Sequence, residues 1–496
     1  MGKLNVLFKE TAIYGLSSIL GRFLNWCLVP MYTYVLASAS EYGIVTNLYA
    51  WTALLLVILT YGMETGFFRF VNNENEETKA KTVYGTTLFS VFSTSCLFIL
   101  LGCLFSQNIA DFMGYSSHSE YIWMMVVVVA IDAFTAIPFA YLRYKQKAIK
   151  FATIKLLMIF INIALNLFFL IGCPKIWQTN SEWISWFYSP NYGVGYVLIA
   201  NLISTSAVLF MLLPDIFEAK FSPDFSLLKR MLRYSLPLLV LGIAGIMNQT
   251  VDKIIFPYLF PGEEGMRQLG IYGACFKVAM VMMMFTQAFR FAYEPFLFAQ
   301  HKDKNSREAY ADAMKFFVIF SLLIFLAMFF YLDLLKFLIA PNYWEGLKIV
   351  PIILISYLFQ GVFFNLSLWY KLIDKTYFGA CFSLLGVLIT LTINVIFVPK
   401  FGYLGSAWAS FVCYFVLMIV SYLFGQKYFP INYKLKDLAI YVFAGILLCF
   451  VSEICETSIV WINYLLRAFL ICLFVALIIK RDMPLNKMPF IGKYFD

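Results

Sequence analysis

The sequence is poor in charged residues and in histidine. Asp, Glu, Lys and Arg together make up 13% of its 496 residues, and there are 2 histidines. Soluble domains carry about 25% charged residues, so this composition excludes an ordinary soluble protein. Hydrophobic residues reach 62% instead, and apolar runs of about 20 residues, each long enough to span a bilayer, recur from end to end. We therefore expect an all-α polytopic membrane protein.

Signatures of catalysis and of metal binding are also missing. The 10 cysteines are scattered without a CxxC pair, so neither a zinc site nor a disulfide framework is expected. No histidine accompanies a nucleophile, and no Gly-rich phosphate loop precedes a Lys-Ser/Thr pair. We expect no enzyme activity, no catalytic residue, no metal and no cofactor. Any transport would then depend on an ion gradient, the membrane potential or consumption of the substrate.

The basic residues follow the pattern of membrane topology. The net charge is +9, but Lys and Arg lie between the hydrophobic segments, which argues against nucleic acid as a partner. Alternate connections hold about 23 of them, Arg143 included, and the opposite connections about four. The bias predicts an even number of spans with both termini cytoplasmic. We expect about 14 spans, near residues 11–35, 43–70, 83–106, 120–142, 150–172, 192–214, 234–259, 269–298, 310–331, 346–371, 377–398, 403–424, 436–454 and 459–479.

An internal repeat relates the two halves of the chain. Gly43 begins the second span and Gly270 the eighth, each at the same distance after a proline. The run Glu64–Phe70 falls opposite Glu294–Phe298. Repeats of this kind are typical of transporters, whose substrate site lies at the repeat interface. We expect an N-terminal six-helix bundle at 1–218, a C-terminal six-helix bundle at 219–430, and two extra membrane helices with a cytoplasmic tail at 431–496.

The candidate site residues are ionisable side chains inside the predicted spans. A charge at bilayer depth costs about 2.5–3.5 kcal/mol on insertion scales, so it faces a partner or water rather than lipid. These charges concentrate in spans one, two, seven and eight, and facing spans would enclose an excess of positive charge suited to phosphate. The substrate-binding cations are predicted to be Arg22, Lys277, Arg290, Lys253 and Arg69, and the coupling or structural acids Glu64, Asp132, Asp252 and Glu294.

Some of these residues have an equally good structural explanation. Arg69 lies near a span end, from which its side chain can reach the interface. Arg290 and Glu294 are spaced i, i+4 and can form a helix ion pair. Asp252 and Lys253 are neighbours about 100° apart on a helix, so they need not pair with each other.

Other residues are harder to explain as structural. Arg22 and Lys277 lie too deep to reach the interface easily, which favours a lumenal role for both. Asp132 is either the structural partner of a lumenal cation or a coupling-ion site. The longest connection, 173–191, is rich in Trp and Tyr, and we interpret it as an external interfacial aromatic belt.

Four stretches carry a resemblance to a known family: Phe8–Leu36, Glu41–Ala50, Tyr61–Phe70 and, in the second half, Ala288–Gln300. With them the chain resembles the multidrug/oligosaccharidyl-lipid/polysaccharide exporter (MOP) superfamily. Within that superfamily it is most similar to bacterial polysaccharide-biosynthesis flippases of the O-antigen and capsule type. The resemblance covers nearly the whole chain, but its motifs mark the family rather than the substrate.

The resemblance implies two six-helix bundles that face each other across a cleft and work by alternating access. Its implied cargo is an undecaprenyl-pyrophosphate-linked oligosaccharide, as in lipopolysaccharide biosynthesis, moved across the bacterial inner membrane. Arg22 sits in the GR-containing opening of the family, and Arg290 and Glu294 sit in its eighth-span motif. The other predicted cations are assigned only because they lie deep within the predicted membrane spans. The expected partners are the lipid-linked substrate, membrane lipids and other polysaccharide assembly proteins.

Three alternatives remain open. A cation-coupled multidrug exporter of the same fold would favour an acidic lumen and about 12 spans. A flippase of the peptidoglycan lipid precursor would share the two extra C-terminal spans. A membrane enzyme would need a sizeable outer loop or an acidic pair at a membrane face, and neither is evident.

Overall fold

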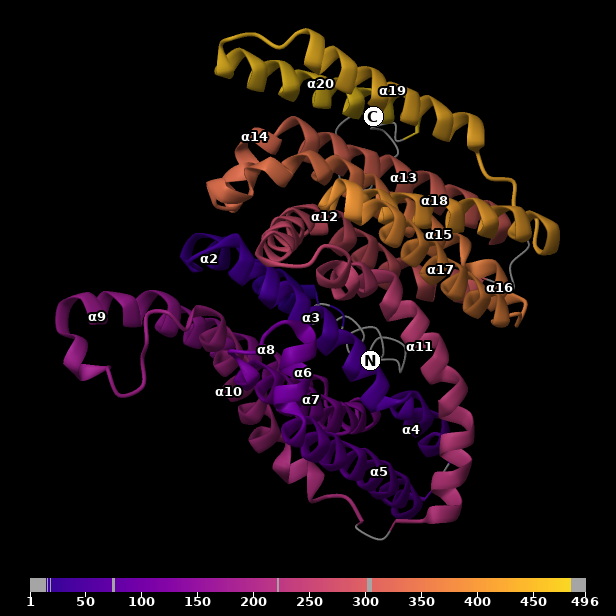
Figure 1. Cartoon of the computed structure of the whole chain (residues 1–496). Coiled ribbons are helices and arrows are strands. Elements are labelled where there is room, and N and C mark those ends of the chain that lie inside the picture. Colours follow the sequence, from indigo (N-terminus) through magenta and orange to yellow (C-terminus); the bar gives the residue numbers. More distant parts are fainter. Residues whose placement is uncertain are drawn as a thin grey trace. The chain divides into compact units, whose positions relative to one another are not determined.

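The structure is a computed structural model that describes residues 15, 17, 19–73, 76–220, 223–300 and 306–482, except the side chains of residues 292, 294–300 and 306. These residues are mainly helical and form no β-strand (Figure 1). They contain 13 helices long and apolar enough to cross a membrane, and each coincides with a predicted span. The first predicted span, 11–35, lies partly outside the described residues. Its described part is helical at 19–26 and in α2 (Leu28–Val35). The predicted fold class is confirmed.

The chain forms two compact units. Unit 1 comprises residues 1–273 and 394–402, and unit 2 comprises residues 274–393 and 403–496. Two helices, α12 (Glu263–Gln300) and α17 (Tyr377–Phe401), contribute to both. The predicted domains 1–218, 219–430 and 431–496 follow the internal repeat, whereas these two units are defined by contacts. The predicted boundaries therefore stay a prediction.

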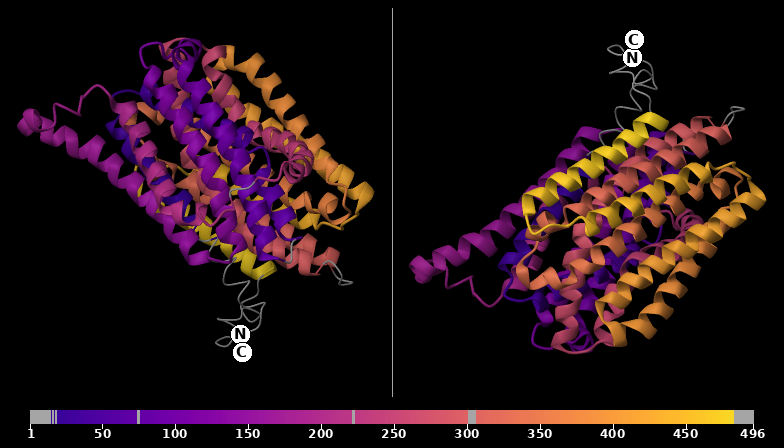
Figure 2. Two further views of the ribbon diagram at one scale, coloured as in Figure 1. Left: turned by 90° about the horizontal axis from the view of Figure 1, so that it is seen from below. Right: turned by 90° about the horizontal axis from the view of Figure 1, so that it is seen from above.

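Unit 1 is a bundle of long helices. The magenta and indigo helices run side by side in Figure 2, as membrane spans do. In chain order, after α2, they are α3 (Ala39–Thr60), α4 (Met63–Val71), α5 (Glu77–Leu104), α6 (Ser106–Met113), α7 (Ser119–Tyr144), α8 (Ala148–Leu167), α9 (Cys173–Asn180), α10 (Gly193–Ile216) and α11 (Phe225–Leu259).

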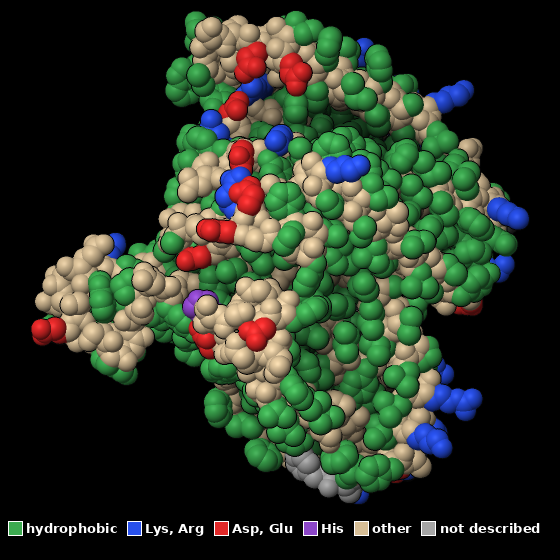
Figure 3. Space-filling view, in the orientation of Figure 1, with side chains coloured by type: hydrophobic (Ala, Val, Ile, Leu, Met, Phe, Trp, Pro, Cys, Tyr) green, Lys and Arg blue, Asp and Glu red, His purple; other side chains and the backbone are tan. Residues whose placement is uncertain are grey.

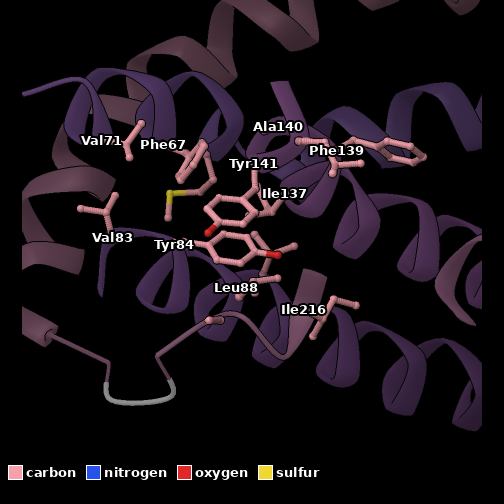
Figure 4. Packing of buried hydrophobic residues seen from close by; sticks show 14 of the residues in the cluster. Phe67, Val71, Val83, Tyr84, Leu88, Ile137, Phe139, Ala140, Tyr141 and Ile216 are labelled. Atoms are coloured by element: carbon pink, nitrogen blue, oxygen red, sulfur yellow. The ribbon is translucent and has the colours of Figure 1, made fainter. Parts of the chain in front are cut away.

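The core of unit 1 is built on stacked aromatic rings. Tyr84 of α5 and Tyr141 of α7 are fully buried, and their rings stack at a centroid distance of 4.0 Å and an angle of 5°. Phe67 of α4 meets Tyr84 edge-on at 6.1 Å. Figure 4 shows these rings surrounded by aliphatic side chains of the same cluster. Because aromatic pairs add about 0.5–1.5 kcal/mol beyond their buried area, this stack holds α4, α5 and α7 together.

A backbone break separates α3 from α4 within the second span. Tyr61 and Gly62 have positive φ angles of 31° and 73°, which end one helix and begin the next. A β-carbon on Gly62 would lie 2.8 Å from the Ser235 carbonyl oxygen of α11, and one on Gly66 would lie 2.5 Å from the Ser235 hydroxyl. The two glycines therefore form a notch on α4 that receives α11.

A projecting arm, residues 168–192, extends from α8. A π-helical turn, Phe168–Gly172, continues α8 into α9 and then into a short 3₁₀ turn, Ser181–Trp183. The part predicted as a loop from residue 173 is thus helical at first. Pro174 directly follows the π-helical turn, where the hydrogen-bond pattern of the helix shifts, so the helix continues through the proline without breaking. In Figure 1, α9 extends beyond the ends of the other unit 1 helices.

Unit 2 contains most of α12 and the helices that follow it. They are α13 (Ser306–Phe330), α14 (Leu332–Leu335), the 3₁₀ turns Lys336–Leu338 and Pro341–Ile349, α15 (Val350–Leu366), α16 (Leu368–Leu372), α17, α18 (Tyr403–Tyr428), α19 (Leu435–Ile454) and α20 (Val460–Arg481). Hydrophobic side chains cover much of the face shown in Figure 3, as a lipid-exposed protein requires.

A buried ion pair fastens the last two helices of unit 2 to α13. Lys315 Nζ of α13 donates to Asp482 Oδ1 at 2.7 Å, and the Tyr441 hydroxyl of α19 donates to Asp482 Oδ2 at 2.6 Å. Desolvation alone would raise the pKa of Asp482, but these hydrogen bonds outweigh it and hold the pKa below its usual value. The carboxylate therefore stays ionised and joins three helices.

We expect Asp482→Asn to destabilise unit 2, because it leaves the Lys315 ammonium buried without its counter-charge. Such a loss costs about 3–5 kcal/mol. A depressed carboxyl pKa stabilises the fold above about pH 4, and this contribution is lost as the pH falls through the lowered value. The thermal midpoint in detergent should therefore be lower for the variant than for wild type at neutral pH. This difference between the two midpoints should be smaller at acidic pH. Asp333→Asn, which alters a side chain 56% exposed, should have little effect.

Candidate functional site

Asp252 and Lys253 of α11 form a buried ion pair. Lys253 Nζ lies 3.1 Å and 3.0 Å from the two carboxylate oxygens and also donates to the Gln249 carbonyl at 3.1 Å. The Tyr272 hydroxyl donates to Asp252 Oδ2 at 2.6 Å, and the Asn47 amide donates to the Lys253 carbonyl at 2.8 Å. The two charged side chains are only 3% and 10% exposed. Adjacent residues thus pair because the long lysine side chain folds back along the helix.

Glu64 and Asp132 also have basic neighbours within unit 1. Glu64 of α4 forms an ion pair with Arg143 at the end of α7. The Arg143 guanidinium carbon lies 5.1 Å from the Phe68 ring centroid. Asp132 of α7 interacts electrostatically with Lys155 of α8. Glu64 therefore has an ion-pair partner within its own unit, whereas Asp132 interacts with Lys155 without a direct ion pair among the described residues.

Arg143, the partner of Glu64, was not among the candidate site residues predicted from the sequence. Arg143 was assigned to a connection because it follows the fourth span, whereas the structure turns it toward α4. The two residues are 79 positions apart. No local pattern links them, and only the aromatic packing of α4 on α7 brings them together.

The other two cations assigned to unit 1 lie at its surface. Arg69 is exposed at the end of α4, with its guanidinium carbon 4.1 Å from the Tyr234 ring centroid of α11. This contact is a cation–π interaction at the edge of the Gly62/Gly66 notch. Arg22 is exposed on the helical residues 19–26.

In unit 2, α12 carries the remaining predicted site residues. Lys277 and Arg290 are both half-buried. The Arg290 guanidinium carbon lies 4.8 Å from the Phe364 ring centroid of α15, which fixes the plane of the guanidinium. Glu294 also lies on α12, but its side chain is outside the described residues.

The repeat-related glycines of α3 and α12 meet within unit 1. A β-carbon on Gly43 would lie 2.0 Å from the Met266 carbonyl oxygen, and one on Gly270 would lie 1.9 Å from the Ala39 carbonyl oxygen. Each glycine also approaches the backbone nitrogen of the other. The crossing is therefore nearly symmetric, and only residues without a side chain allow this approach. It places the beginning of the eighth span directly on the second.

Neither a metal site nor a catalytic group emerges from this geometry. Among the residues that the structure describes, no cluster of three or more His, Cys, Asp or Glu side chains could hold a metal ion. Among its described residues, unit 1 contains the buried pair Asp252–Lys253, the partly exposed pair Glu64–Arg143 and two surface cations on its first two spans.

We expect Gly43→Ala to lower the thermal midpoint of the purified protein. The added methyl group meets backbone rather than a movable side chain, and overpacking of this kind costs about 1–3 kcal/mol. Gly245→Ala is the matched control, because a β-carbon at this glycine of α11 meets nothing within 4 Å. Equal midpoints for the two variants would contradict the close crossing.

Asp252→Asn should destabilise the protein by about 3–5 kcal/mol, because it leaves a buried lysine uncompensated. The double variant Asp252→Asn/Lys253→Met should recover part of that loss. A double-mutant cycle measured by thermal unfolding in detergent gives the coupling between the two sites. Glu264→Gln, which alters an exposed i, i+3 pair with Arg267, serves as the control and should change little. Strictly additive effects at residues 252 and 253 would contradict the pair.

Comparison of the fold with solved structures identifies its architecture. The chain matches "Lipid II flippase MurJ, inward closed conformation" with a TM-score of 0.73 at 14% identity, covering 95% of this chain and 99% of that one. It also matches an inward-facing multidrug resistance MATE family transporter of the MOP superfamily, with a TM-score of 0.64 at 14% identity over 82% and 94% of the two chains. A structure of the MATE multidrug transporter DinF-BH gives a TM-score of 0.60 at 17% identity over 84% and 95%. At these identities the likeness shows the fold alone.

Comparison of the sequence identifies the family. No curated protein matches the chain. Residues 7–290, more than half of the chain, match the family described as polysaccharide biosynthesis protein. The resemblance inferred from the sequence motifs is confirmed. The chain belongs to the polysaccharide biosynthesis protein family and has the fold of the MOP-superfamily transporters.

Proposed function

We propose that this protein is a flippase for an oligosaccharide linked to undecaprenyl pyrophosphate. It moves this lipid from the inner to the outer leaflet of the bacterial inner membrane by alternating access. The family match and the transporter fold support this function. The Lys and Arg bias of the connections supports an orientation with both termini cytoplasmic.

The observation that carries the choice of substrate is the local compensation of the deep acids. In unit 1, Glu64 pairs with Arg143, and Asp252 pairs with Lys253. Asp132 interacts electrostatically with Lys155, without an ion pair among the described residues. A drug exporter that binds cations needs ionised acids available to its cargo, whereas these acids already have cations. An anionic cargo therefore fits the described charges better than a cationic one.

Three cations are the proposed phosphate ligands, each taken by itself: Arg22 in unit 1, and Lys277 and Arg290 on α12 in unit 2. Arg22 is exposed, and Arg290 is stacked on Phe364, which orients the planar fork that binds phosphate oxygens in pairs. Lys277 adds a point charge on the same helix as Arg290. The sugars would occupy the polar lumen while the polyprenyl tail stays in lipid. We assign Arg69 to the edge of this path and Lys253 to a structural role, because its charge is already engaged by Asp252.

A flippase of the peptidoglycan lipid precursor is the second candidate. The observation in its favour is the extent of the structural match, which covers 95% of this chain and 99% of MurJ. Both candidates transport a polyprenyl pyrophosphate, so the charge argument does not distinguish them. Complementation of strains that lack one or the other flippase would distinguish the two candidates.

We expect Arg22→Ala and Lys277→Ala each to reduce translocation about tenfold to a hundredfold. A charge-assisted hydrogen bond contributes about 1.5–3 kcal/mol, which corresponds to this range. The assay is restoration of surface polysaccharide in a strain that lacks its own oligosaccharide flippase, with membrane levels of each variant measured in parallel. Arg22→Lys should retain part of the activity, because it keeps the charge but loses the fork.

Lys79→Ala is the control, because Lys79 is 59% exposed in an i, i+3 pair that precedes the predicted third span. It should complement like the wild type. Drug resistance measured in the same strains separates the multidrug alternative, which predicts a changed resistance profile without restored polysaccharide. Full activity of both Arg22→Ala and Lys277→Ala would remove the proposed phosphate site.

A further inference from the structure

The first turns of α11 carry three basic residues that form no ion pair with any residue the structure describes. They are Lys229, Arg230 and Arg233, and all three side chains are exposed. We call them the basic face of α11. Arg230 interacts electrostatically with Asp224, but that carboxylate is already engaged as the helix cap, where it accepts hydrogen bonds from two backbone N–H groups. The positive charge of the basic face is therefore largely uncompensated within the described part of unit 1.

Cations of the neighbouring helix ends pair with acids instead. The beginning of α11 lies beside the beginning of α5, because the Asp224 backbone N–H donates to the Thr86 hydroxyl at 3.1 Å. Around this point the ion pairs are Lys81–Glu77, Lys145–Glu77, Lys150–Asp215 and Arg143–Glu64. Membrane topology requires only that cations lie on this side of the protein. It does not explain why the unpaired ones share one face of one helix.

The basic face continues into an apolar stripe on the same side of α11. Five exposed residues follow one another here at a spacing of three or four: Phe225, Lys229, Arg233, Leu236 and Val240. The three apolar side chains are 66%, 49% and 57% exposed. The opposite side of the helix is buried in unit 1 at Leu227, Met231 and Ser235. Large exposed apolar side chains on a membrane helix favour contact with acyl chains over contact with water.

The length of α11 places the basic face at the level of the lipid head groups. The helix has 35 residues, or about 52 Å, whereas the hydrocarbon core is about 30 Å thick. No charged residue occurs from Tyr234 to Val251, a run that nearly fills the core. The cations just before Tyr234 therefore lie at one boundary of the core, where long basic side chains reach the head groups.

A fourth cation lies beside the basic face. Arg69 of α4 is exposed, and its guanidinium carbon lies 4.1 Å from the ring centroid of Tyr234. Tyr234 follows Arg230 by one helical turn on the same side of α11. In Figure 3, Lys and Arg side chains project from the side of unit 1 where Figure 1 shows the first half of α11. Like charges gathered in this way repel one another, and a bound anion removes the repulsion.

We propose that the basic face of α11 binds the phosphate of an anionic phospholipid in the adjacent leaflet. The guanidinium groups of Arg230 and Arg233 present paired N–H donors that match phosphate oxygens, and Lys229 adds a point charge. The acyl chains of the same lipid lie along Leu236 and Val240. An anionic head group fits better than a zwitterionic one, whose own ammonium balances its phosphate. The site is distinct from the proposed substrate cations and does not depend on the identity of the substrate.

The test uses phosphatidylglycerol with a photoreactive group in one acyl chain, added to phosphatidylcholine nanodiscs that contain the full chain. After illumination, mass spectrometry locates the labelled residues. We expect label at residues 236–240 of wild type and at least about tenfold less in Arg230→Gln/Arg233→Gln. The reason is that each basic residue near an anionic surface strengthens binding about fivefold.

Lys79→Gln/Lys81→Gln is the matched control, because it removes the same charge from two ion-paired lysines of α5 and should leave the label at 236–240 unchanged. Arg230→Lys/Arg233→Lys keeps the charge and should retain most of the label. Equal labelling of wild type and the glutamine variant would overturn the site.

A phosphatidylcholine analogue with the same photoreactive group provides the second comparison. It should label residues 236–240 of wild type at least about fivefold less than phosphatidylglycerol does. Equal labelling by the two lipids would also overturn the site, and this comparison holds even if the glutamine variant folds poorly. Displacement of the label by undecaprenyl pyrophosphate, at a concentration at which unlabelled phosphatidylglycerol has no effect, would overturn it too, because the cations would then serve the polyprenyl lipid.

Discussion

The cost of an uncompensated charge in hydrocarbon governs how this protein is assembled. Asp252 cannot remain ionised inside α11 unless a cation lies beside it, and Lys253 provides that cation from the next position. The same demand draws Arg143 from the end of α7 to Glu64 on α4 and places Lys315 against Asp482. The Glu64–Arg143 and Lys315–Asp482 pairs also join different helices, which hydrophobic packing alone would leave free to slide.

Compensation within one unit has a consequence for movement. The pairs Glu64–Arg143 and Asp252–Lys253 lie inside unit 1, and Lys315–Asp482 lies inside unit 2. Because each pair lies within one unit, a movement of either unit as a rigid body would not have to break it, and for the two buried pairs such a break would cost about 3–5 kcal/mol. The contact of α3 with α12 at Gly43 and Gly270 also lies inside unit 1, but it depends on close packing rather than on charge.

The spans were predictable from the sequence, whereas the partners inside them were not. Apolar runs of about 20 residues and the alternation of Lys and Arg depend on the bilayer, which acts on each segment separately. Ion pairs depend on tertiary packing. The sequence marked Glu64 as a deep acid, but its partner 79 residues away followed only from the stacking of α4 against α7. For Asp252 and Lys253, helical geometry left the pairing open, and the flexible lysine side chain decided it. The helical part of the projecting arm was assigned to a connection rich in Trp and Tyr, whereas a π-helical turn carries the helix on through Pro174.

The two halves of the sequence repeat were predicted to face each other, and their equivalent glycines are in contact. Gly43 and Gly270 each allow the backbone of the other helix to approach where any side chain would clash. Such mutual dependence is what a pseudo-twofold relation between repeats produces, because a residue near the axis meets its own counterpart. Apart from this contact, the second and eighth spans each carry an arginine beside an aromatic ring, Arg69 near Tyr234 and Arg290 near Phe364, but the two arginines are not equivalent positions of the repeat. Both are stacked on an aromatic ring, which desolvates a guanidinium at low cost and keeps its edge oriented.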